Sequence, residues 1–484
     1  MPRPTDDKRP DDGGPEDGPL SCDVAVIGAG TAGIAAERAA RKAGARTLLI
    51  DPEFRGTLCA STGCMPSKLL IAAAHAAHDV RRADIFGVRA DAPTIDGPAV
   101  MARVQRERDR FAALTRESIE TLPEGIAIRG RARFVAPTRL VLEDGRPIEA
   151  RAVVIATGSV ALIPEPFRDL GPRILTNETL FELPDLPRRL AVIGGGAIGL
   201  EIAQAMGRLG VAVTLFDSGT TLGKARCAKV HDALHTAMAR DITLCLGVEV
   251  KPEAAADGIR LRWTGDAEGQ AEFDHVLLAV GRPPNLSGLN LERAGLALDD
   301  HGTPCFDPAT MQCGDAPIFI AGDADADVPL LHEASTEGAI AGANAAAFPD
   351  IRPADRSPDF ALTFTDPPLA QIGAGPGDGI ICGRSDYADQ GRARVEARAE
   401  GIVSLYADAS GRLIGADLCC PGTEHLAHLL AWSIQSGATA SGLLSMPFYH
   451  PTLEEGLKSA LREICRATSQ PLPEGRDRGM PPGA

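Results

Sequence analysis

The chain has 484 residues, of which 44% are hydrophobic, and it carries a formal net charge of −16 at pH 7. A chain of this length and hydrophobic content can form two to four globular domains. The negative charge opposes binding to nucleic acid or to an anionic membrane surface, so we expect neither as a partner.

Both ends of the chain are rich in Pro, Gly and charged residues. Residues 1–20 lack the apolar core of a signal peptide, and no later apolar run is long enough to span a membrane. We therefore expect a cytoplasmic protein with disordered tails at residues 1–20 and 468–484. Most of the eleven cysteines should then be thiols, and no spacing of Cys and His indicates a metal site.

An apolar strand at residues 24–27 leads into Gly28, Gly30 and Gly33, which open an Ala-rich helix, and a second strand ends at Asp51. In such a βαβ unit the first glycine makes a tight turn and the second lets the backbone approach a pyrophosphate. The third glycine packs helix on strand, and the acid binds a ribose hydroxyl. The pattern predicts a dinucleotide-binding site.

Cys59 and Cys64 follow, with four residues between them. Pro66 is typical of the first helical position and residues 67–80 read as a helix, which places Cys64 just ahead of a helix N-terminus. The unpaired N–H groups and the dipole there favour a thiolate, and Lys68 adds a positive charge. We interpret the pair as a redox-active disulfide, although two unrelated buried thiols also fit the spacing alone.

The βαβ pattern recurs in the middle of the chain. A strand at residues 190–193 leads into Gly194, Gly196 and Gly199, and the next strand ends at Asp217 with the same spacing as in the first unit. Because every position with a chemical task is filled, we interpret it as a second dinucleotide site rather than a decayed duplicate.

The remaining strands are apolar, and three of them end in glycine turns. Strand ends face the ligand crevice in open α/β sheets, so Asp323 can bond a cofactor hydroxyl, or it can cap a helix. A long helix at residues 99–121 and strands near 126–134 and 140–142 are expected as scaffold. The three apolar strands that end in glycine turns are 153–155, followed by Thr157 and Gly158, 276–280, followed by Gly281, and 318–321, followed by Asp323.

Two features mark the C-terminal part. His450 and Glu455 lie in the run Phe-Tyr-His-Pro-Thr-Leu-Glu-Glu, and histidine is the side chain whose pKa suits a general base. Cys419 and Cys420 follow the predicted strand at residues 413–418. Since neighbouring residues of a strand point to opposite faces, we expect these two cysteines to be structural rather than a metal site or a second redox centre.

Together these motifs resemble the flavoprotein disulfide reductases with two dinucleotide-binding sites, the family of dihydrolipoamide dehydrogenase, glutathione reductase and mercuric reductase. The resemblance extends from about residue 21 to about residue 467. It rests on residues 28–33 with Asp51, 59–68, 156–158, 194–201, 279–282, 321–323 and 448–455.

The resemblance implies an α/β fold with two Rossmann-like dinucleotide-binding domains, for FAD and NAD, and a C-terminal α+β dimerisation domain. The FAD-binding domain is expected at residues 21–165 and 286–355, the NAD-binding domain at 166–285 and the interface domain at 356–467. The residues implied to bind FAD are Gly28, Gly30, Gly33, Asp51, Lys68, Thr157, Gly158 and Asp323, and those implied to bind NAD are Gly194, Gly196, Gly199, Asp217 and Gly281.

The resemblance also implies catalytic roles. Cys64 would be the thiolate that faces the flavin, and Cys59 the thiol that exchanges with substrate. His450 would be the base, oriented by Glu455, and would reach the disulfide of the other subunit, so that the active form is a homodimer. Lys68 and Glu201 would form an ion pair beside the flavin.

Within the family, three features favour an NAD-dependent dihydrolipoamide dehydrogenase, with a lipoyl domain as partner. Both Cys59 and Cys64 are present. His450 stands where mercuric reductases carry tyrosine, and this chain lacks their C-terminal cysteine pair. Asp217 would repel a 2′-phosphate. Lys224, in the loop where NADP-using relatives place arginine, keeps an NADPH-dependent reductase of glutathione or another small disulfide open. A weakly catalytic structural flavoprotein of an acyltransferase complex is a further alternative.

Overall fold

The computed structural model describes residues 19–472. They form two compact units. Unit 1 consists of residues 19–54, 121–158 and 284–354, and unit 2 consists of residues 55–120, 159–283 and 355–472.

The predicted tails fall partly outside the described residues, since nothing is described for residues 1–18 and 473–484. At their inner ends the predicted tails are too long. Leu20 already belongs to the first strand. Near the other end, Nε2 of Gln470 donates a hydrogen bond of 2.8 Å to the carbonyl of Ser410. The folded part therefore extends beyond the predicted limits on both sides.

Seven of the described strands form the sheet of unit 1. Parallel pairing joins β2 to β1 and β3 and joins β6 to β1 and β15, while β4 and β5 add an antiparallel edge. The central strands are continuous apolar runs because both of their faces are covered. The strands are β1 (Leu20–Ile27), β2 (Thr47–Asp51), β3 (Ala127–Arg129), β4 (Ala132–Ala136), β5 (Arg139–Leu142), β6 (Pro147–Ile155) and β15 (Ile318–Ile320).

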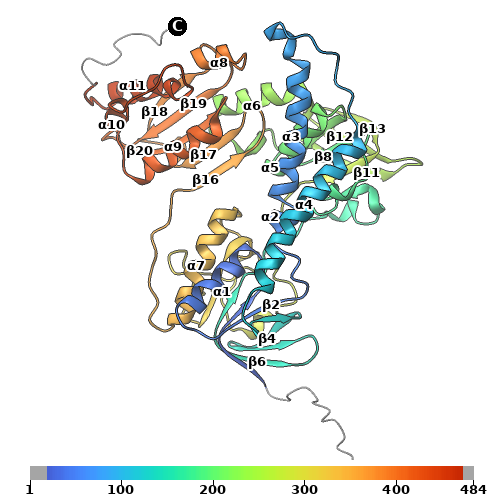
Figure 1. Cartoon of the computed structure of the whole chain (residues 1–484), viewed down its shortest axis with the longest axis vertical. Coiled ribbons are helices and arrows are strands. Elements are labelled where there is room, and N and C mark those ends of the chain that lie inside the picture. Colours follow the sequence, from blue (N-terminus) through green and yellow to red (C-terminus); the bar gives the residue numbers. More distant parts are fainter. Residues whose placement is uncertain (1–18, 473–484) are drawn as a thin grey trace, which may run out of the picture. The chain divides into compact units, whose positions relative to one another are not determined.

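Helices α1 (Thr31–Lys42) and α7 (Leu331–Ala347) lie side by side in unit 1 (Figure 1). Glycine makes this close approach possible. A Cβ atom on Gly338 would come within 2.2 Å of the carbonyl oxygen of Ala32, and one on Gly342 within 2.1 Å of that of Ala36. The small residues of both helices thus let the backbones touch.

Unit 2 contains a parallel sheet in the order β10-β9-β8-β14-β7 and a separate antiparallel sheet β11-β12-β13. Helix α5 connects β8 to β9 and α6 connects β9 to β10, the arrangement that the second βαβ pattern predicts. The bounds are β7 (Ile174–Leu175), β8 (Arg189–Ile193), α5 (Ala197–Arg208), β9 (Ala212–Asp217), α6 (Ala228–Asp241), β10 (Thr243–Leu246), β11 (Val248–Ala254), β12 (Ile259–Gly265), β13 (Gly269–Phe273) and β14 (His275–Leu278).

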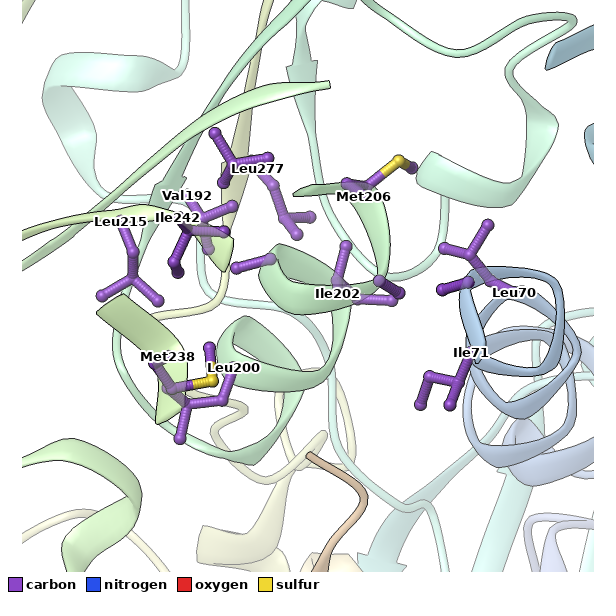
Figure 2. Packing of buried hydrophobic residues seen from close by; sticks show 14 of the residues in the cluster. Leu70, Ile71, Val192, Leu200, Ile202, Met206, Leu215, Met238, Ile242 and Leu277 are labelled. Carbon is purple, nitrogen blue, oxygen red and sulfur yellow. The ribbon is translucent and has the colours of Figure 1, made fainter. Parts of the chain in front are cut away.

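The cysteine segment belongs to unit 2. The predicted long helix is α4 (Gly97–Glu120), and the helix after the cysteines is α3 (Cys64–Arg81). Helix α3 packs on α5, with Leu70 and Ile71 on one side of the contact and Ile202 and Met206 on the other (Figure 2). This shared apolar core fixes α3, and hence its first residue, relative to the nucleotide-binding part of the same unit.

The C-terminal part of unit 2 is an antiparallel sheet in the order β16-β17-β20-β19-β18, with helices α9, α10 and α11 (Figure 1). The α/β class, with Rossmann-like sheets and a C-terminal antiparallel domain, is therefore confirmed. The bounds are β16 (Phe360–Thr363), β17 (Leu369–Gly373), β18 (Ile381–Asp386), α8 (Gly391–Val395), β19 (Ile402–Ala407), β20 (Leu413–Cys419), α9 (Thr423–Gln435), α10 (Ala440–Leu444) and α11 (Leu457–Ala467).

Short helical turns complete the described chain. They are α2 (Leu58–Ser61) and the 3₁₀ helices η1 (Ala83–Phe86), η2 (Glu165–Phe167), η3 (Gly171–Arg173), η4 (Leu180–Glu182), η5 (Leu222–Lys224), η6 (Leu291–Arg293), η7 (Gly322–Ala324) and η8 (Glu454–Gly456). Across residues 19–472, no helix combines the length and the apolar character that crossing a bilayer requires.

Cys419 and Cys420 are both buried, and they face different cores. Cys419 packs in the cluster that includes Leu369, whereas Cys420 packs in the cluster that includes Leu426. The prediction that the two side chains point to opposite faces is confirmed.

Candidate active site

Cys59 and Cys64 lie on two successive helical turns. Cys59 belongs to the short helix α2, whose N-terminus is capped by the hydroxyl of Thr57. Cys64 is the first residue of α3. The predicted helix start at Pro66 is therefore wrong by two residues, because Gly63 supplies the N-cap and Pro66 falls within the first turn. Both sulfurs are thiols in this structure and both are half-buried.

The two thiols are electrostatically unequal. A hydrogen bond from Cys59 lowers the pKa of the Cys64 thiol to about 7, against the effect of burial, and Lys68 lowers it further while Glu201 acts in the opposite direction. The same hydrogen bond, followed by burial, raises the pKa of the Cys59 thiol. Around neutral pH Cys64 is therefore the sulfur that ionises, whereas Cys59 stays a thiol.

Lys68 and Glu201 form an ion pair between α3 and α5, with 2.7 Å between Nζ and Oε2. Lys68 follows Cys64 by one helical turn. The side chain of Glu201 is only 7% exposed, so its charge needs partners. Nζ of Lys68 is one partner, and the peptide N–H of Phe364, 3.0 Å from Oε1, is another.

Phe364 was not predicted from the sequence. It follows β16, and Nζ of Lys68 lies 4.3 Å from the centre of its ring. No periodicity or motif marks this residue, because its importance comes from elements far apart in the chain. The only sequence signal is its place in a Thr-Phe-Thr-Asp-Pro-Pro run that precedes a strand.

The loop between the cysteines is held by a second interaction that the sequence did not indicate. Nδ2 of Asn177 donates a 3.0 Å hydrogen bond to the carbonyl of Thr62. Asn177 is itself fixed by Nη1 of Arg282, which donates to its Oδ1 at 2.6 Å. Arg282 follows Gly281 at the end of β14, so the cysteine loop is tied to the end of a strand in the same unit.

His450 and Glu455 form a close pair, with 2.9 Å between Nδ1 and Oε2. The histidine side chain is 50% exposed, while that of Glu455 is 9% exposed. Within residues 19–472 of a single chain, no hydrogen bond or ion pair links this pair to Cys59 or Cys64. The structure therefore brings together the two members of each predicted pair, but not the two pairs.

The first nucleotide loop, in unit 1, has the backbone that its glycines predict. Gly28 has φ +106°, and a Cβ on Gly33 would lie 1.8 Å from the carbonyl oxygen of Gly28. Nothing lies within 4 Å of a Cβ built on Gly30, which leaves the space that a pyrophosphate needs. Oδ2 of Asp51 accepts a 3.1 Å hydrogen bond from the N–H of Ala29, so the acid also anchors the loop.

Other predicted FAD residues gather at the same edge of this sheet. Thr157 and Gly158 follow β6, and Asp323 lies in η7, directly after β15, which pairs with β6. The buried hydroxyl of Thr157 has no hydrogen-bond partner among the described residues. An orphaned hydroxyl beside an open glycine loop fits the binding of a cofactor with polar groups, as FAD has.

The second loop repeats the first. Gly194 has φ +109°, Gly196 faces open space, and a Cβ on Gly199 would lie 1.9 Å from the carbonyl oxygen of Gly194. Asp217 accepts hydrogen bonds from the N–H groups of Gly195 at 2.6 Å and Gly219 at 2.7 Å. This loop therefore also fits a dinucleotide.

Two more residues that the sequence analysis names lie in unit 2. Gly281 follows β14 and also faces open space. Lys224 is exposed, in a loop that is bonded to the second nucleotide loop through the N–H of Gly223 and the carbonyl of Gly195, at 2.8 Å.

A dithiol with one low-pKa sulfur, together with two open dinucleotide loops, defines a flavoprotein disulfide oxidoreductase. Residues 22–338 match the family described as pyridine nucleotide-disulphide oxidoreductase, and residues 360–461 match the dimerisation domain of that family. The chain belongs to the pyridine nucleotide-disulphide oxidoreductase family. The second match supports a homodimer formed through this domain.

Relatives with different activities are similar to this chain. A dihydrolipoyl dehydrogenase of Chlamydia muridarum is 30% identical over 450 residues, covering 90% of this chain and 94% of the relative. A mercuric reductase of Acidithiobacillus ferrooxidans is 34% identical over 463 residues, covering 92% of this chain and 83% of the relative. Enzymes with two different substrates are thus similar to this chain to nearly the same degree.

Solved structures agree with the fold. The crystal structure of LpdA from Mycobacterium tuberculosis has a TM-score of 0.78 and 26% identity, and the match covers 91% of this chain and 99% of that one. The flavoprotein disulfide reductase RclA from Escherichia coli, in its copper complex, has a TM-score of 0.78 and 22% identity, with 91% and 99% coverage, and shows the fold alone.

Proposed function

We propose that this enzyme oxidises the dihydrolipoamide group of a lipoyl domain and reduces NAD to NADH through Cys59 and Cys64. The observation that carries the proposal is the His450–Glu455 pair. A dithiol substrate must lose two protons on oxidation, and an imidazole oriented by a carboxylate is suited to accept them. Reduction of a mercuric ion, by contrast, needs no base to deprotonate a dithiol.

The proposed exchange follows from the unequal thiols. A substrate thiolate, formed when His450 accepts its proton, attacks the sulfur of Cys59 in the oxidised enzyme, and Cys64 leaves as the thiolate. The second substrate thiol then displaces Cys59, giving the cyclic disulfide of lipoamide and the enzyme dithiol. Cys64 is the better leaving group because its pKa lies near 7, well below that of Cys59.

The cofactor residues are proposed as the family resemblance implies them, with FAD on the loop of Gly28, Gly30 and Gly33 and NAD on the loop of Gly194, Gly196 and Gly199. When bound, FAD would accept the electron pair of the dithiol and pass it to the nicotinamide as hydride. The proposal places the FAD-binding domain at residues 21–165 and 286–355, the NAD-binding domain at 166–285 and the interface domain at 356–467. The partner subunit's His450 would serve the Cys59–Cys64 pair.

Asp217 supports NAD rather than NADP as the nucleotide. Its carboxylate is held at the end of β9 by two N–H groups. A fixed negative charge there would repel a 2′-phosphate. The exposed Lys224 in the neighbouring loop is the observation that favours the second candidate, an NADPH-dependent reductase of a small disulfide.

The test is an anaerobic mixture of the purified holoenzyme with dihydrolipoamide and NAD, and then NADP, while nicotinamide absorbance is followed. The Cys59→Ser variant is compared with a control variant at the exposed Cys305, Cys305→Ser. We expect NADH formation that Cys59→Ser abolishes and Cys305→Ser leaves intact. Oxidation of NADPH by glutathione disulfide, or of NAD(P)H by mercuric ion, without lipoamide turnover would overturn the proposal, and no turnover in any mixture would favour a structural role.

A further inference from the structure

Phe364 contacts both members of the Lys68–Glu201 pair. Its peptide N–H donates to Oε1 of Glu201 at 3.0 Å, and Nζ of Lys68 lies 4.3 Å from its ring centre, within cation–π range. Oε2 of Glu201 is taken by Lys68 at 2.7 Å. One residue thus completes the hydrogen bonding of a buried carboxylate and covers the cation that pairs with it.

The segment that carries Phe364 is itself fixed to α5. Gln204 accepts from the N–H of Asp366 at 2.8 Å and donates to its carbonyl at 3.0 Å. Nη1 of Arg208 bonds the carboxylate of Asp366 at 2.7 Å. Because Glu201, Gln204 and Arg208 follow one buried face of the helix, the segment is anchored along two helical turns and the ring has a defined place.

Lys68 needs this restraint. Its side chain is 31% exposed, and a lysine with four rotatable bonds gains entropy by moving its ammonium into water. Such a movement would take the positive charge away from Cys64, one turn earlier on α3, and leave Glu201 with one partner fewer. The ring of Phe364 opposes that movement without adding a charge of its own.

We propose that Phe364 is a positioning residue, whose ring holds the Lys68 ammonium beside Cys64 while its N–H holds Glu201. It acts on Cys64 through Lys68. The importance of this positioning role for turnover rests on the proposed function. This role predicts that the ring alone, independent of the backbone contact to Glu201, tunes the Cys64 thiolate.

Three variants separate the ring from the rest of the segment. Phe364→Leu keeps the N–H and removes the ring, and Phe364→Tyr keeps both. Leu362→Ala, on β16 and half-buried, removes apolar packing from the same segment, where Leu362 packs against the cluster that includes Leu426. The holoenzymes are reduced with dithiothreitol, desalted anaerobically and alkylated with iodoacetamide between pH 5 and pH 10. Mass spectrometry measures the rate of alkylation at Cys64, with alkylation of the exposed Cys305 as the internal reference.

We expect Phe364→Leu to move the alkylation midpoint of Cys64 upward by about 0.5 to 1 pH unit. At pH 7 the rate should fall by up to about five-fold, while at pH 10 it should match the wild-type rate. Phe364→Tyr and Leu362→Ala should keep the wild-type midpoint. An unchanged midpoint in Phe364→Leu, or an equal shift in Leu362→Ala, would overturn the inference.

The alkylation measurement needs neither lipoamide nor a nicotinamide. If the Cys64 midpoint shifts in Phe364→Leu but neither the wild-type enzyme nor any variant turns over dihydrolipoamide, Phe364 positions the ion pair and the proposed substrate is wrong. If dihydrolipoamide is turned over but the midpoint stays in place, the proposed function holds and the positioning role fails. In the case where both hold, Phe364→Leu should lower the lipoamide rate at pH 7 more than at pH 9.

Discussion

Glu455 lies between His450 and Lys458, with Oε2 at 2.9 Å from Nδ1 of the histidine and Oε1 at 3.3 Å from Nζ of the lysine. Burial alone would raise the pKa of this carboxyl, but the hydrogen bonds from His450, the N–H of Thr452 and Lys458 outweigh it and hold the pKa below its usual value. The carboxylate therefore stays ionised at neutral pH. It makes Nδ1 the donor and leaves Nε2 free to accept a proton.

Replacing Glu455 by glutamine should disable the base while the fold is kept. The amide can donate to Nδ1, which favours the tautomer with the proton already on Nε2. We expect Glu455→Gln to lower the rate of lipoamide-dependent NADH formation by about 10²- to 10⁴-fold. NADH oxidation by ferricyanide, which needs no thiol base, should be unaffected.

The adjacent Glu454 provides the matched control for this prediction. Glu454→Gln introduces the same chemical change one residue away from the pair, and it should retain most of the lipoamide activity. An equal loss in both variants, or a loss of ferricyanide activity in Glu455→Gln, would show that the effect is structural.

The hydrogen bond between the two thiols should be visible in the reactivity of Cys64. In Cys59→Ser a hydroxyl can still donate to the Cys64 sulfur, whereas in Cys59→Ala no donor remains. We expect the alkylation midpoint of Cys64 to stay near pH 7 in the serine variant, and to rise by about one unit or more in the alanine variant. Identical midpoints in the two variants would mean that Lys68 alone sets the thiolate.

Asp217 should control the choice between NAD and NADP. Asp217→Asn keeps an oxygen that accepts from Gly195 or Gly219 but removes the charge. The ratio of kcat/KM for NAD to that for NADP should fall by about tenfold or more, which corresponds to the repulsion of two charges separated by a few ångströms near a protein surface. Asp232→Asn, an exposed change on α6, should leave the ratio unchanged.

A buried carboxyl in unit 1 should make stability depend on pH. Burial, together with the nearby charges of Glu337 and Asp327, raises the pKa of Asp325 to about 8 from a usual value of 3.8. The folded state therefore binds a proton that the unfolded state has lost. The stabilisation is complete below about pH 4, falls as the pH rises, and is lost above about pH 8.

Asp325→Asn cannot ionise, so its stability should vary less between pH 5 and pH 8. The wild-type protein should lose up to about 1.4 kcal/mol more per pH unit than the variant over this range. The midpoint of thermal unfolding, followed at pH 5, 6, 7 and 8, measures the difference. Asp315→Asn, at an exposed site, serves as the control, and parallel curves for wild type and Asp325→Asn would contradict the assignment.

The contact between α1 and α7 should not tolerate a single methyl group. In Gly338→Ala the added Cβ would lie 2.2 Å from the carbonyl oxygen of Ala32, a backbone atom that cannot move without shifting α1. We expect a loss of about 1–3 kcal/mol in the free energy of unfolding. Ser335→Ala, on the exposed side of α7, should be neutral, as measured by thermal unfolding.

The residues alone predicted the two nucleotide loops and the lowered pKa of the Cys64 thiol, whereas the pairing of His450 with Glu455 was predicted from the resemblance to a family. The first two features are local, because glycine conformation and the position of a residue at a helix N-terminus are set by the neighbouring chain. The sequence also placed Cys419 and Cys420 on opposite faces. Its errors lay at boundaries, such as the start of α3 at Cys64 rather than Pro66, where capping by Gly63 decides.

Which distant residues surround these features depends on the tertiary structure. Lys68 meets Glu201 across α3 and α5, and the resemblance to a family predicted that pair, but neither pattern nor family motif indicated that Phe364 completes it. The hydrogen bond from Asn177 to the cysteine loop and the position of Asp325 beside Glu337 are likewise contacts that the sequence did not indicate. Such contacts depend on how separately formed elements pack, and packing brings together residues whose separation along the chain carries no local signal.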